Sequence, residues 1–450
     1  MVKKSSWIAA VLAVFVSSLW AQNLGRVPIQ ITRVPTTTHG VFFVKASIPL
    51  PEAAGILNTE RLAIVDEGGQ LLFAAAGGNF PLAKQGQRLA AQFTVLSRWQ
   101  GTVAESGKPI KWLLAEFPLD PSRNSTDQIV LTTEAEPESP SASLQISETA
   151  SAIRIATGKL SATISKKRGT LFEQLQCNGR TLLQASPENA FTLQDANGVN
   201  YFTGLALPHE IKIEKRGPQV ATILVRGAFK NAAGSYLTTI NDSTSFSRLH
   251  QPFPFLTYTL RYHFYAEQDY LTLDFTLENN GVYGYWTELK FAGKQWLYFQ
   301  SLALNLNFAL ADTAKKVTTE GFSRAFNDEL WELYQNHVET NLSEAQNFSY
   351  RISKNGALLK SGARARGWLE VHDGNNGLVA AVQHFWQNAP KKISWQKNRL
   401  QMHLWPAEGK WPSNVATTGF EPDNAQAETY QFEGGRHKTH TLLLRFYEGP

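Results

Sequence analysis

Residues 256–277 read LTYTLRYHFYAEQDYLTLDFTL, and this stretch decides the fold class. Apolar side chains occupy every second position, first from Leu256 to Phe264 and then from Leu271 to Leu277. Alternation with a period of two is typical of a strand that buries one face, and the residues between the two runs supply a turn. The stretch therefore predicts an antiparallel β-hairpin.

Two shorter stretches repeat this alternation. Residues 61–65 and 71–75 are predicted to pair around Gly68-Gly69, and residues 153–164 are predicted to fold back across Gly158. Because such hairpins dominate the sequence, we expect an all-β protein.

Helical periodicity is scarce, so only one or two short helices are expected. The best candidate begins near Ser323 and carries one apolar stripe, formed by Phe326, Leu330, Leu333, Tyr334 and His337. A second short helix is predicted over 383–387, where Pro390 would stop it.

The N-terminus has the layout of a secretory signal peptide. Lys3 and Lys4 precede an apolar core, and small residues follow up to Ala21. We expect residues 1–21 to be removed and the mature protein to be secreted or periplasmic. No later stretch approaches the roughly 20 apolar residues of a membrane-spanning helix, so no membrane span is expected.

One shift in composition divides the remaining chain. Residues 134–141 are acidic, rich in Pro and Ser, and free of large apolar side chains. Such a stretch is typical of an interdomain linker. We therefore predict a smaller β-domain over 22–133, a linker over 134–142 and a larger β-domain over 143–450.

The composition excludes several classes of function. A formal net charge of +5 without a Lys/Arg run of the nucleic-acid-binding type argues against nucleic acid as a partner, and a single cysteine, Cys177, permits no intramolecular disulfide. The sequence contains no HExxH, Cys/His metal, phosphate-loop or Gly-x-Ser-x-Gly motif. The 12 Trp, 13 Tyr and 26 Phe residues are suited to filling β cores and to stacking on sugar rings.

A set of motifs in a fixed order carries a family resemblance. Two predicted strands of the smaller domain place a basic residue directly before a tryptophan, at Arg98-Trp99 and Lys111-Trp112. The motifs of the larger domain lie at 213–218, 262–266, 273–275, 367–369, 385–391, 404–409 and 434–440. Together they resemble the rhamnogalacturonan exolyase (PcRGLX/YetA-like) family over nearly all of the mature chain.

The resemblance implies a fold and an activity. It implies a small N-terminal RIFT-type β-barrel over 22–133, followed by a large central antiparallel β-sandwich over 143–450. The implied activity is cleavage of an acidic plant-type polysaccharide or oligosaccharide by β-elimination. Members of the family continue into an α/α toroid that helps to form the substrate cleft, whereas this sequence stops at Pro450. Either a toroid domain lies on a continuation of the chain, or the protein lacks it.

β-Elimination needs a base, an acid and a cation that neutralises the substrate carboxylate. The residues near the C-terminus that suit these tasks give candidate catalytic residues Arg436, His440 and His403. The candidate substrate-binding residues are Trp386, Trp405, His384 and Lys438. No metal ligands and no required cofactor are predicted, although Ca²⁺ is an alternative means of neutralising the carboxylate.

Strand alternation places Arg436, Lys438 and His440 on one face and His437 on the other, so His437 and His440 are not expected to share a metal.

Simpler interpretations stay open for several of these residues. His403 fits a surface position on a strand, and Trp386 and Trp405 fit the sandwich core. The Arg98-Trp99 and Lys111-Trp112 pairs fit a cation–π ladder as well as a sugar platform. Two other functions also stay open, namely a non-catalytic carbohydrate-binding or scaffold module and a glycoside hydrolase.

Overall fold

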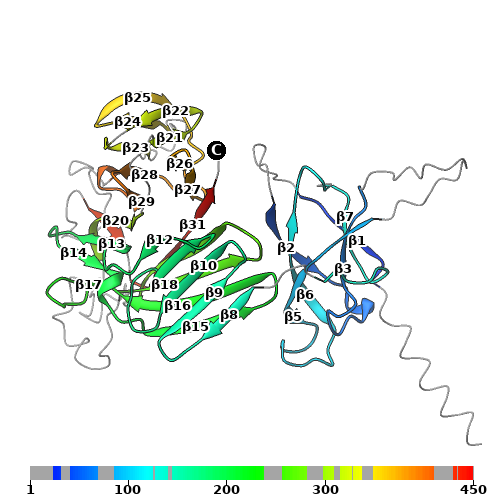
Figure 1. Ribbon diagram of the computed structural model, residues 1–450. Coiled ribbons are helices and arrows are strands. Elements are labelled where there is room, and N and C mark those ends of the chain that lie inside the picture. Colours follow the sequence, from blue (N-terminus) through cyan, green and yellow to red (C-terminus); the bar gives the residue numbers. More distant parts are fainter. Residues whose placement is uncertain are drawn as a thin grey trace, which may run out of the picture. The chain divides into compact units, whose positions relative to one another are not determined.

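The computed structural model shows a chain built from antiparallel strands (Figure 1). It describes residues 24–31, 41–68, 86–124, 127–139, 144–237, 256–280, 297–308, 315–326, 328–336, 348–409, 429–432 and 434–448. Within these residues the only helical segments are the short 3-10 turns Glu52–Ala54, Thr203–Leu205 and Ala407–Gly409. The all-β fold class is therefore confirmed. None of the helices in the described residues is long and apolar enough to cross a membrane.

Both predicted helices are wrong where the structure describes them. Residues from Ser323 onward form parts of strands β22 (Phe322–Phe326) and β23 (Trp331–Gln335). Trp331 and Leu333 are buried on the inner face of β23, so the same apolar residues also fit a period of two. Residues 383–388 form a turn instead of the second helix. His337, residues 71–75 and the predicted signal peptide over 1–21 lie outside the described residues.

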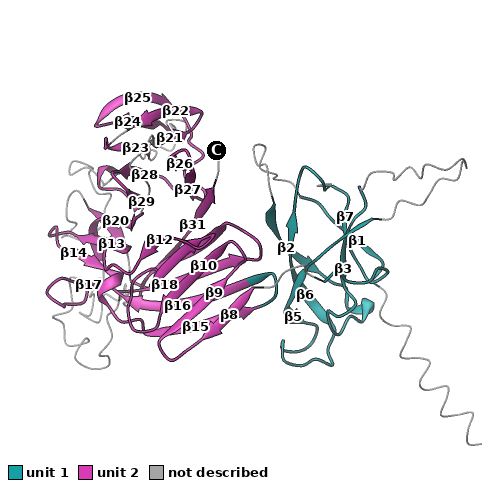
Figure 2. Ribbon diagram, viewed as in Figure 1, with its two compact units in different colours: residues 1–143, 217–220 teal, residues 144–216, 221–450 magenta. Residues whose placement is uncertain are grey.

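The chain forms two compact units (Figure 2). Unit 1 comprises residues 1–143 and 217–220, and unit 2 comprises residues 144–216 and 221–450. Residues 134–139, the described part of the predicted linker, form neither helix nor strand. The short segment 217–220 belongs to unit 1, although the sequence analysis assigned it to the larger domain.

Unit 1 contains two antiparallel sheets in its described residues. The four-stranded sheet has the order β1 (Arg26–Ile29), β7 (Ile129–Thr132), β3 (Ala63–Asp66) and β4 (Gln87–Leu89). The three-stranded sheet has the order β2 (Phe42–Pro49), β6 (Ile110–Leu119) and β5 (Gln92–Arg98). Alternate residues of β6, such as Leu113 and Phe117, are fully buried in the core of this unit. The RIFT-type barrel implied for this region stays a prediction.

Unit 2 begins with a five-stranded antiparallel sheet. Its order is β12 (Arg180–Gln184), β11 (Gln174–Cys177), β10 (Leu160–Ser165), β9 (Ala152–Ala156) and β8 (Gln145–Glu148). Strands β9 and β10 pair across Gly158, as the alternation over 153–164 predicts.

Two larger sheets make up the rest of unit 2. The nine-stranded sheet has the order β15 (Glu210–Arg216), β16 (Val220–Ala228), β18 (Leu256–Tyr265), β19 (Tyr270–Asn279), β31 (His437–Glu448), β27 (Asn376–Val382), β26 (Trp368–His372), β21 (Lys315–Thr319) and β22. The other has the order β17 (Lys230–Asn231), β14 (Asn200–Phe202), β13 (Ala190–Asp195), β20 (Leu297–Asn307), β29 (Arg399–Trp405), β28 (Lys391–Gln396), β23, β24 (Tyr350–Lys354) and β25 (Ala357–Gly362), with β30 (Tyr430–Phe432) paired to β20. We call them the nine-stranded and the ten-stranded sheet.

The predicted hairpin over 256–277 is confirmed as β18 and β19, in the middle of the nine-stranded sheet. Its apolar face packs against the ten-stranded sheet, because Phe275 of β19 stacks on Phe191 of β13 with ring centroids 3.8 Å apart. Burying one such side chain contributes about 2 kcal/mol. The two large sheets therefore form a sandwich, and the opposite face of β19 carries polar side chains.

Candidate functional site

A pocket of about 420 Å³ lies beside the first residues of strand β31. We call it the cationic pocket, because its described lining contains several basic side chains and no carboxylate. The lining residues are Gln387, Asn388, Ala389, Lys391, Trp405, Gln431, Phe432, Arg436, His437, Lys438 and His440. Four residues that sequence reasoning proposed for one site, Arg436, Lys438, His440 and Trp405, are among them.

Strand alternation directs two of these side chains toward the interior of the sandwich. His440 lies opposite Phe275 in the register between β19 and β31, and Lys438 lies opposite Leu277. Because both partners belong to the buried face of β19, Lys438 and His440 share that face. The pocket thus lies at the end of the space between the two large sheets.

Trp405 reaches the same space from the ten-stranded sheet. Leu302 pairs with Trp405 and Ala303 with His403, so Leu404 is an extra residue in β29. Such a bulge interrupts the alternation of side chains. Trp405 consequently contacts the ring of His440 edge to face, with centroids 4.7 Å apart.

His440 is an unusual residue for this position. Its side chain is only 3% exposed, and neither ring nitrogen has a hydrogen-bond partner among the described residues. Burial, followed by the charges of Lys391 and Lys438, holds the pKa of His440 well below its ordinary value. The imidazole is therefore neutral near pH 7 and retains its capacity to accept a proton or a hydrogen bond.

Sequence reasoning missed Lys391, the most deeply buried cation of the pocket. Its ammonium group donates to the carbonyl oxygens of Asn388, Pro390 and Leu404 at 2.5, 3.0 and 2.6 Å. Burial and the nearby charge of Lys438 lower the pKa of Lys391 to about 7. Lys391 thus joins the turn over 383–388 to strand β29 and adds a titratable charge to the pocket.

Lys438 is held by the same turn. Its ammonium group donates to the side-chain oxygen of Asn388 at 2.8 Å. This neutral partner leaves the positive charge of Lys438 without a carboxylate in the described lining. A bound anion can therefore interact with that charge without first displacing an ion pair.

The other three candidate residues lie elsewhere. His403 belongs to the outer face of the ten-stranded sheet, 3.4 Å from the Ser394 hydroxyl, because the bulge at Leu404 separates it from Trp405. Burial and the charge of Lys392 lower the pKa of His403 to about 3, so this residue stays neutral. Its placement in the same site as His440 is therefore corrected.

His384 and Trp386 belong to the turn over 383–388 and do not line the cationic pocket. His384 is exposed and adopts a positive φ of 55°. Trp386 packs edge to face on Phe348 and stacks on the guanidinium of Arg364 at 4.4 Å. These contacts pack Trp386 against its neighbours, and the substrate-binding roles of Trp386 and His384 stay predictions.

The basic and aromatic pairs of unit 1 form part of the expected ladder. Strands β5 and β6 pair, and the Lys111 ammonium lies 4.8 Å from the ring centroid of Trp99. Arg98 instead donates to backbone carbonyl oxygens, and Trp112 is 40% exposed. Packing and hydrogen bonds within unit 1 therefore account for Arg98, Trp99 and Lys111.

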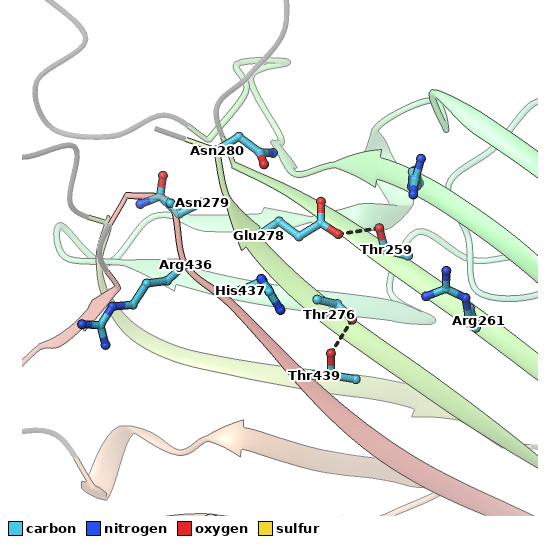
Figure 3. Close-up of a pocket in the computed structure, with 11 residues that line it drawn as sticks. Thr259, Arg261, Thr276, Glu278, Asn279, Asn280, Arg436, His437 and Thr439 are labelled. Atoms are coloured by element: carbon cyan, nitrogen blue, oxygen red, sulfur yellow. Dashed lines mark hydrogen bonds between the residues drawn. The ribbon is translucent and has the colours of Figure 1, made fainter. Parts of the chain in front are cut away.

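A second pocket of about 350 Å³ lies on the opposite face of the nine-stranded sheet (Figure 3). We call it the polar pocket. It is lined by Arg226, Thr259, Arg261, Thr276, Glu278, Asn279, Asn280, Gly435, Arg436, His437 and Thr439. Arg436 and His437 line both pockets, so the start of β31 lies between them.

The described residues contain no group of three His, Cys, Asp or Glu side chains that could hold a metal ion. Cys177 is buried and its thiol lies 3.7 Å from the carbonyl oxygen of Phe446. Burial raises the pKa of Cys177 to about 11, so it is packed as an uncharged thiol.

No protein-family model and no curated protein matches this chain. Similar solved structures include an alpha-mannosidase from Enterococcus faecalis V583, with a TM-score of 0.45 and 10% identity over 91% of this chain and 42% of that one. A galactose mutarotase-like protein from Clostridium acetobutylicum has a TM-score of 0.35 and 11% identity over 68% of this chain and 99% of that one. The chain spans about two fifths of the length of the mannosidase. Both TM-scores lie below 0.5.

Proposed function

We propose that the cationic pocket binds the carboxylate of a uronate unit and that the protein cleaves an acidic polysaccharide by β-elimination. One observation carries this proposal. Arg436, Lys438 and Lys391 line the same pocket as the neutral His440 and Trp405. The resemblance to rhamnogalacturonan exolyases, which rests on the order of the sequence motifs, supports the same reaction.

Binding would rely on charge and on an apolar wall. A carboxylate placed between Arg436 and Lys438 gains charge-assisted hydrogen bonds, and Lys438 has only the neutral Asn388 amide as its partner. Trp405 offers an apolar indole surface to the C–H groups of the sugar, while Asn388 and Gln431 supply polar contacts for hydroxyl groups.

His440 would act as the base. It takes the proton from the carbon next to the carboxylate, the electrons of that C–H bond form the new C=C bond, and the C–O bond to the neighbouring sugar breaks. The imidazolium then returns the proton to the leaving oxygen, so that no external reagent is consumed. Arg436 and Lys438 stabilise the negative charge that develops on the carboxylate.

Substrate binding would also strengthen this base. The charges of Lys391 and Lys438 contribute to the low pKa of His440. A bound carboxylate offsets those charges, and the pKa of His440 rises toward the value that proton transfer requires.

The non-catalytic binding module is the second candidate function, and one observation favours it. All three donors of the Lys391 ammonium are occupied by carbonyl oxygens, and His440 is 3% exposed. A pocket anchored in this way can hold a carboxylate without bringing a base to the sugar carbon. A glycoside hydrolase is less well supported, because hydrolysis commonly uses two carboxylates and the described lining of the cationic pocket has none.

The test uses the full chain with oligogalacturonides and rhamnogalacturonan oligosaccharides, with and without Ca²⁺. Calorimetry measures binding, and ultraviolet absorbance detects unsaturated uronate ends. We expect Lys438→Met to weaken oligogalacturonide binding about tenfold, because it removes a charge-assisted hydrogen bond. The control Lys316→Met removes an exposed lysine from the same sheet, outside both pockets.

His440→Gln distinguishes the two candidate functions. If His440 is the base, this variant retains binding and loses the rise in absorbance. Binding by the wild type without any rise in absorbance establishes the non-catalytic module. The absence of binding to both ligands contradicts the proposal altogether.

A further inference from the structure

Asn388 contacts both lysines of the cationic pocket. Its backbone carbonyl oxygen accepts a hydrogen bond from the Lys391 ammonium at 2.5 Å, and its side-chain oxygen accepts one from the Lys438 ammonium at 2.8 Å. Lys391 begins β28 of the ten-stranded sheet, whereas Lys438 belongs to β31 of the nine-stranded sheet. Asn388 therefore holds close together two like charges that repel each other.

The turn that carries Asn388 is anchored independently of the two lysines. The Gln383 amide donates to the carbonyl oxygen of Thr441 in β31 at 2.9 Å. Phe385 is 1% exposed and packs against Gly367, where an added Cβ would lie 2.2 Å from the phenylalanine side chain. The core of unit 2 therefore sets the position of Asn388, and the lysines are held against it.

Both oxygens that Asn388 offers are uncharged. An aspartate has nearly the same shape as asparagine, but its carboxylate would form an ion pair with Lys438 and offset the positive charge. The Asn388 side chain takes only one of the N–H donors of Lys438, so the others are left for a ligand. An asparagine at this place thus fixes the ammonium group without neutralising it.

We propose that Asn388 is a positioning residue of the cationic pocket, which places Lys391 and Lys438 beside His440 with neutral oxygens and leaves their charges open to an anion. The inference rests on the proposed function for the identity of that anion as a uronate carboxylate. The electrostatic coupling inside the pocket does not depend on a ligand and can be measured without one.

The charge of Lys438 acts on two other titratable groups. Burial and then the charge of Lys438 lower the pKa of Lys391, while burial and the charges of both lysines lower the pKa of His440. The other titratable groups in the described lining are Arg436 and His437, and no carboxylate is among them. Neutralising Lys438 therefore raises the pKa of Lys391 and of His440.

The test compares Asn388→Asp with Asn388→Ala in the full chain. Asn388→Asp is expected to raise the pKa of Lys391 by about one pH unit and to weaken oligogalacturonide binding about tenfold, because its carboxylate pairs with Lys438. Asn388→Ala removes the side-chain acceptor and keeps the backbone acceptor of Lys391. We expect it to change that pKa by less than about half a pH unit and to weaken binding about threefold.

Nuclear magnetic resonance of the lysine side chains measures the pKa, and calorimetry measures the affinity. Lys438→Met removes the charge itself and is expected to raise the pKa of Lys391 as Asn388→Asp does. Asn178→Asp adds the same negative charge to an exposed turn of unit 2 outside both pockets, and it is the matched control. Urea unfolding of each variant verifies that the fold is retained.

The outcomes separate this inference from the proposed function. If Asn388→Asp leaves the pKa of Lys391 unchanged, or if Asn388→Ala raises it equally, Asn388 only packs the turn and the inference is refuted, even when Lys438→Met weakens binding. If the wild type binds no oligogalacturonide, the proposed function fails, while a higher pKa of Lys391 in Asn388→Asp still supports the positioning role.

Discussion

The two pockets beside strand β31 differ in how their charges are partnered. In the cationic pocket, Lys391 and Lys438 are held by carbonyl and amide oxygens, so their charges face the pocket without a carboxylate in the described lining. In the polar pocket, Arg226 and Arg261 have glutamate partners before any ligand arrives. The start of β31 thus borders two pockets with different charge arrangements, because alternate side chains meet different neighbours on the two faces of the sheet.

The largest expected effect is the loss of folding stability in Lys391→Met. The substitution leaves the carbonyl oxygens of Asn388, Pro390 and Leu404 without their donor in a buried site. We expect the free energy of unfolding to fall by about 3 kcal/mol. Urea unfolding measures the change.

A matched substitution in the polar pocket is Thr439→Val, for which we expect a loss below about 1 kcal/mol because the residue is exposed. Equal losses for Lys391→Met and Thr439→Val would mean that the two pockets beside β31 contribute equally to stability.

Arg436→Met gives the next largest expected effect, which is on ligand affinity. This variant tests whether the two pockets act together. Because Arg436 lines both, its removal is expected to weaken oligogalacturonide and rhamnogalacturonan oligosaccharide alike, each about tenfold. Lys438→Met is the comparison, because Lys438 lines the cationic pocket and not the polar one. Calorimetry with both ligands gives the comparison, and an effect of Arg436→Met on one ligand alone would show that the pockets work separately.

The stability of the protein is expected to depend on pH through Lys391 of the cationic pocket. The pKa of Lys391 is lowered from an ordinary 10.5 to about 7, so the folded state holds this proton less tightly than the unfolded chain does. Between about pH 7 and pH 10.5 the unfolded chain still holds the proton while the folded state has lost it. The free energy of unfolding therefore rises with pH in this range. The wild type is therefore expected to gain up to about 1.4 kcal/mol of stability per pH unit in that window, relative to Lys391→Met.

Binding should change in the opposite direction over the same pH range. As Lys391 loses its charge above pH 7, the affinity for oligogalacturonide is expected to fall by about 1 kcal/mol. Calorimetry at several pH values measures this change. An affinity that stays constant from below to above pH 7 would remove Lys391 from the electrostatics of the pocket.

Local patterns in the sequence predict part of the fold and part of the candidate site. The alternation over 256–277 predicts the hairpin at the centre of the nine-stranded sheet, and alternation at 436–440 separates His437 from His440. These predictions succeed because a period of two depends only on neighbouring residues. The gathering of Arg436, Lys438, His440 and Trp405 in one pocket also agrees with their selection as one site.

Other features depend on pairings that no local pattern contains. The extra residue Leu404 turns Trp405 away from His403, and a bulge of this kind has no signature in a strand that otherwise alternates. In the sequence, Lys391 is an ordinary charged residue after Pro390. Its hydrogen-bond partner, the carbonyl oxygen of Leu404, belongs to the next strand, so the contact has no local signal. Glu278 and His437 become neighbours only when β19 pairs with β31.

The smallest expected effect concerns the hydroxyl pair of the polar pocket. Thr276 and Thr439 share a hydrogen bond of 2.8 Å across β19 and β31, and Thr318 and Ser323 share one of 3.0 Å across β21 and β22. Double-mutant cycles with Thr→Val and Ser→Ala substitutions are expected to give a coupling of about 0.5 kcal/mol for each pair, since cross-strand pairs contribute on this scale. Urea unfolding yields both couplings. A coupling at Thr276 and Thr439 as large as the loss in Lys391→Met would indicate that the polar pocket, and not the cationic one, is the structural anchor of strand β31.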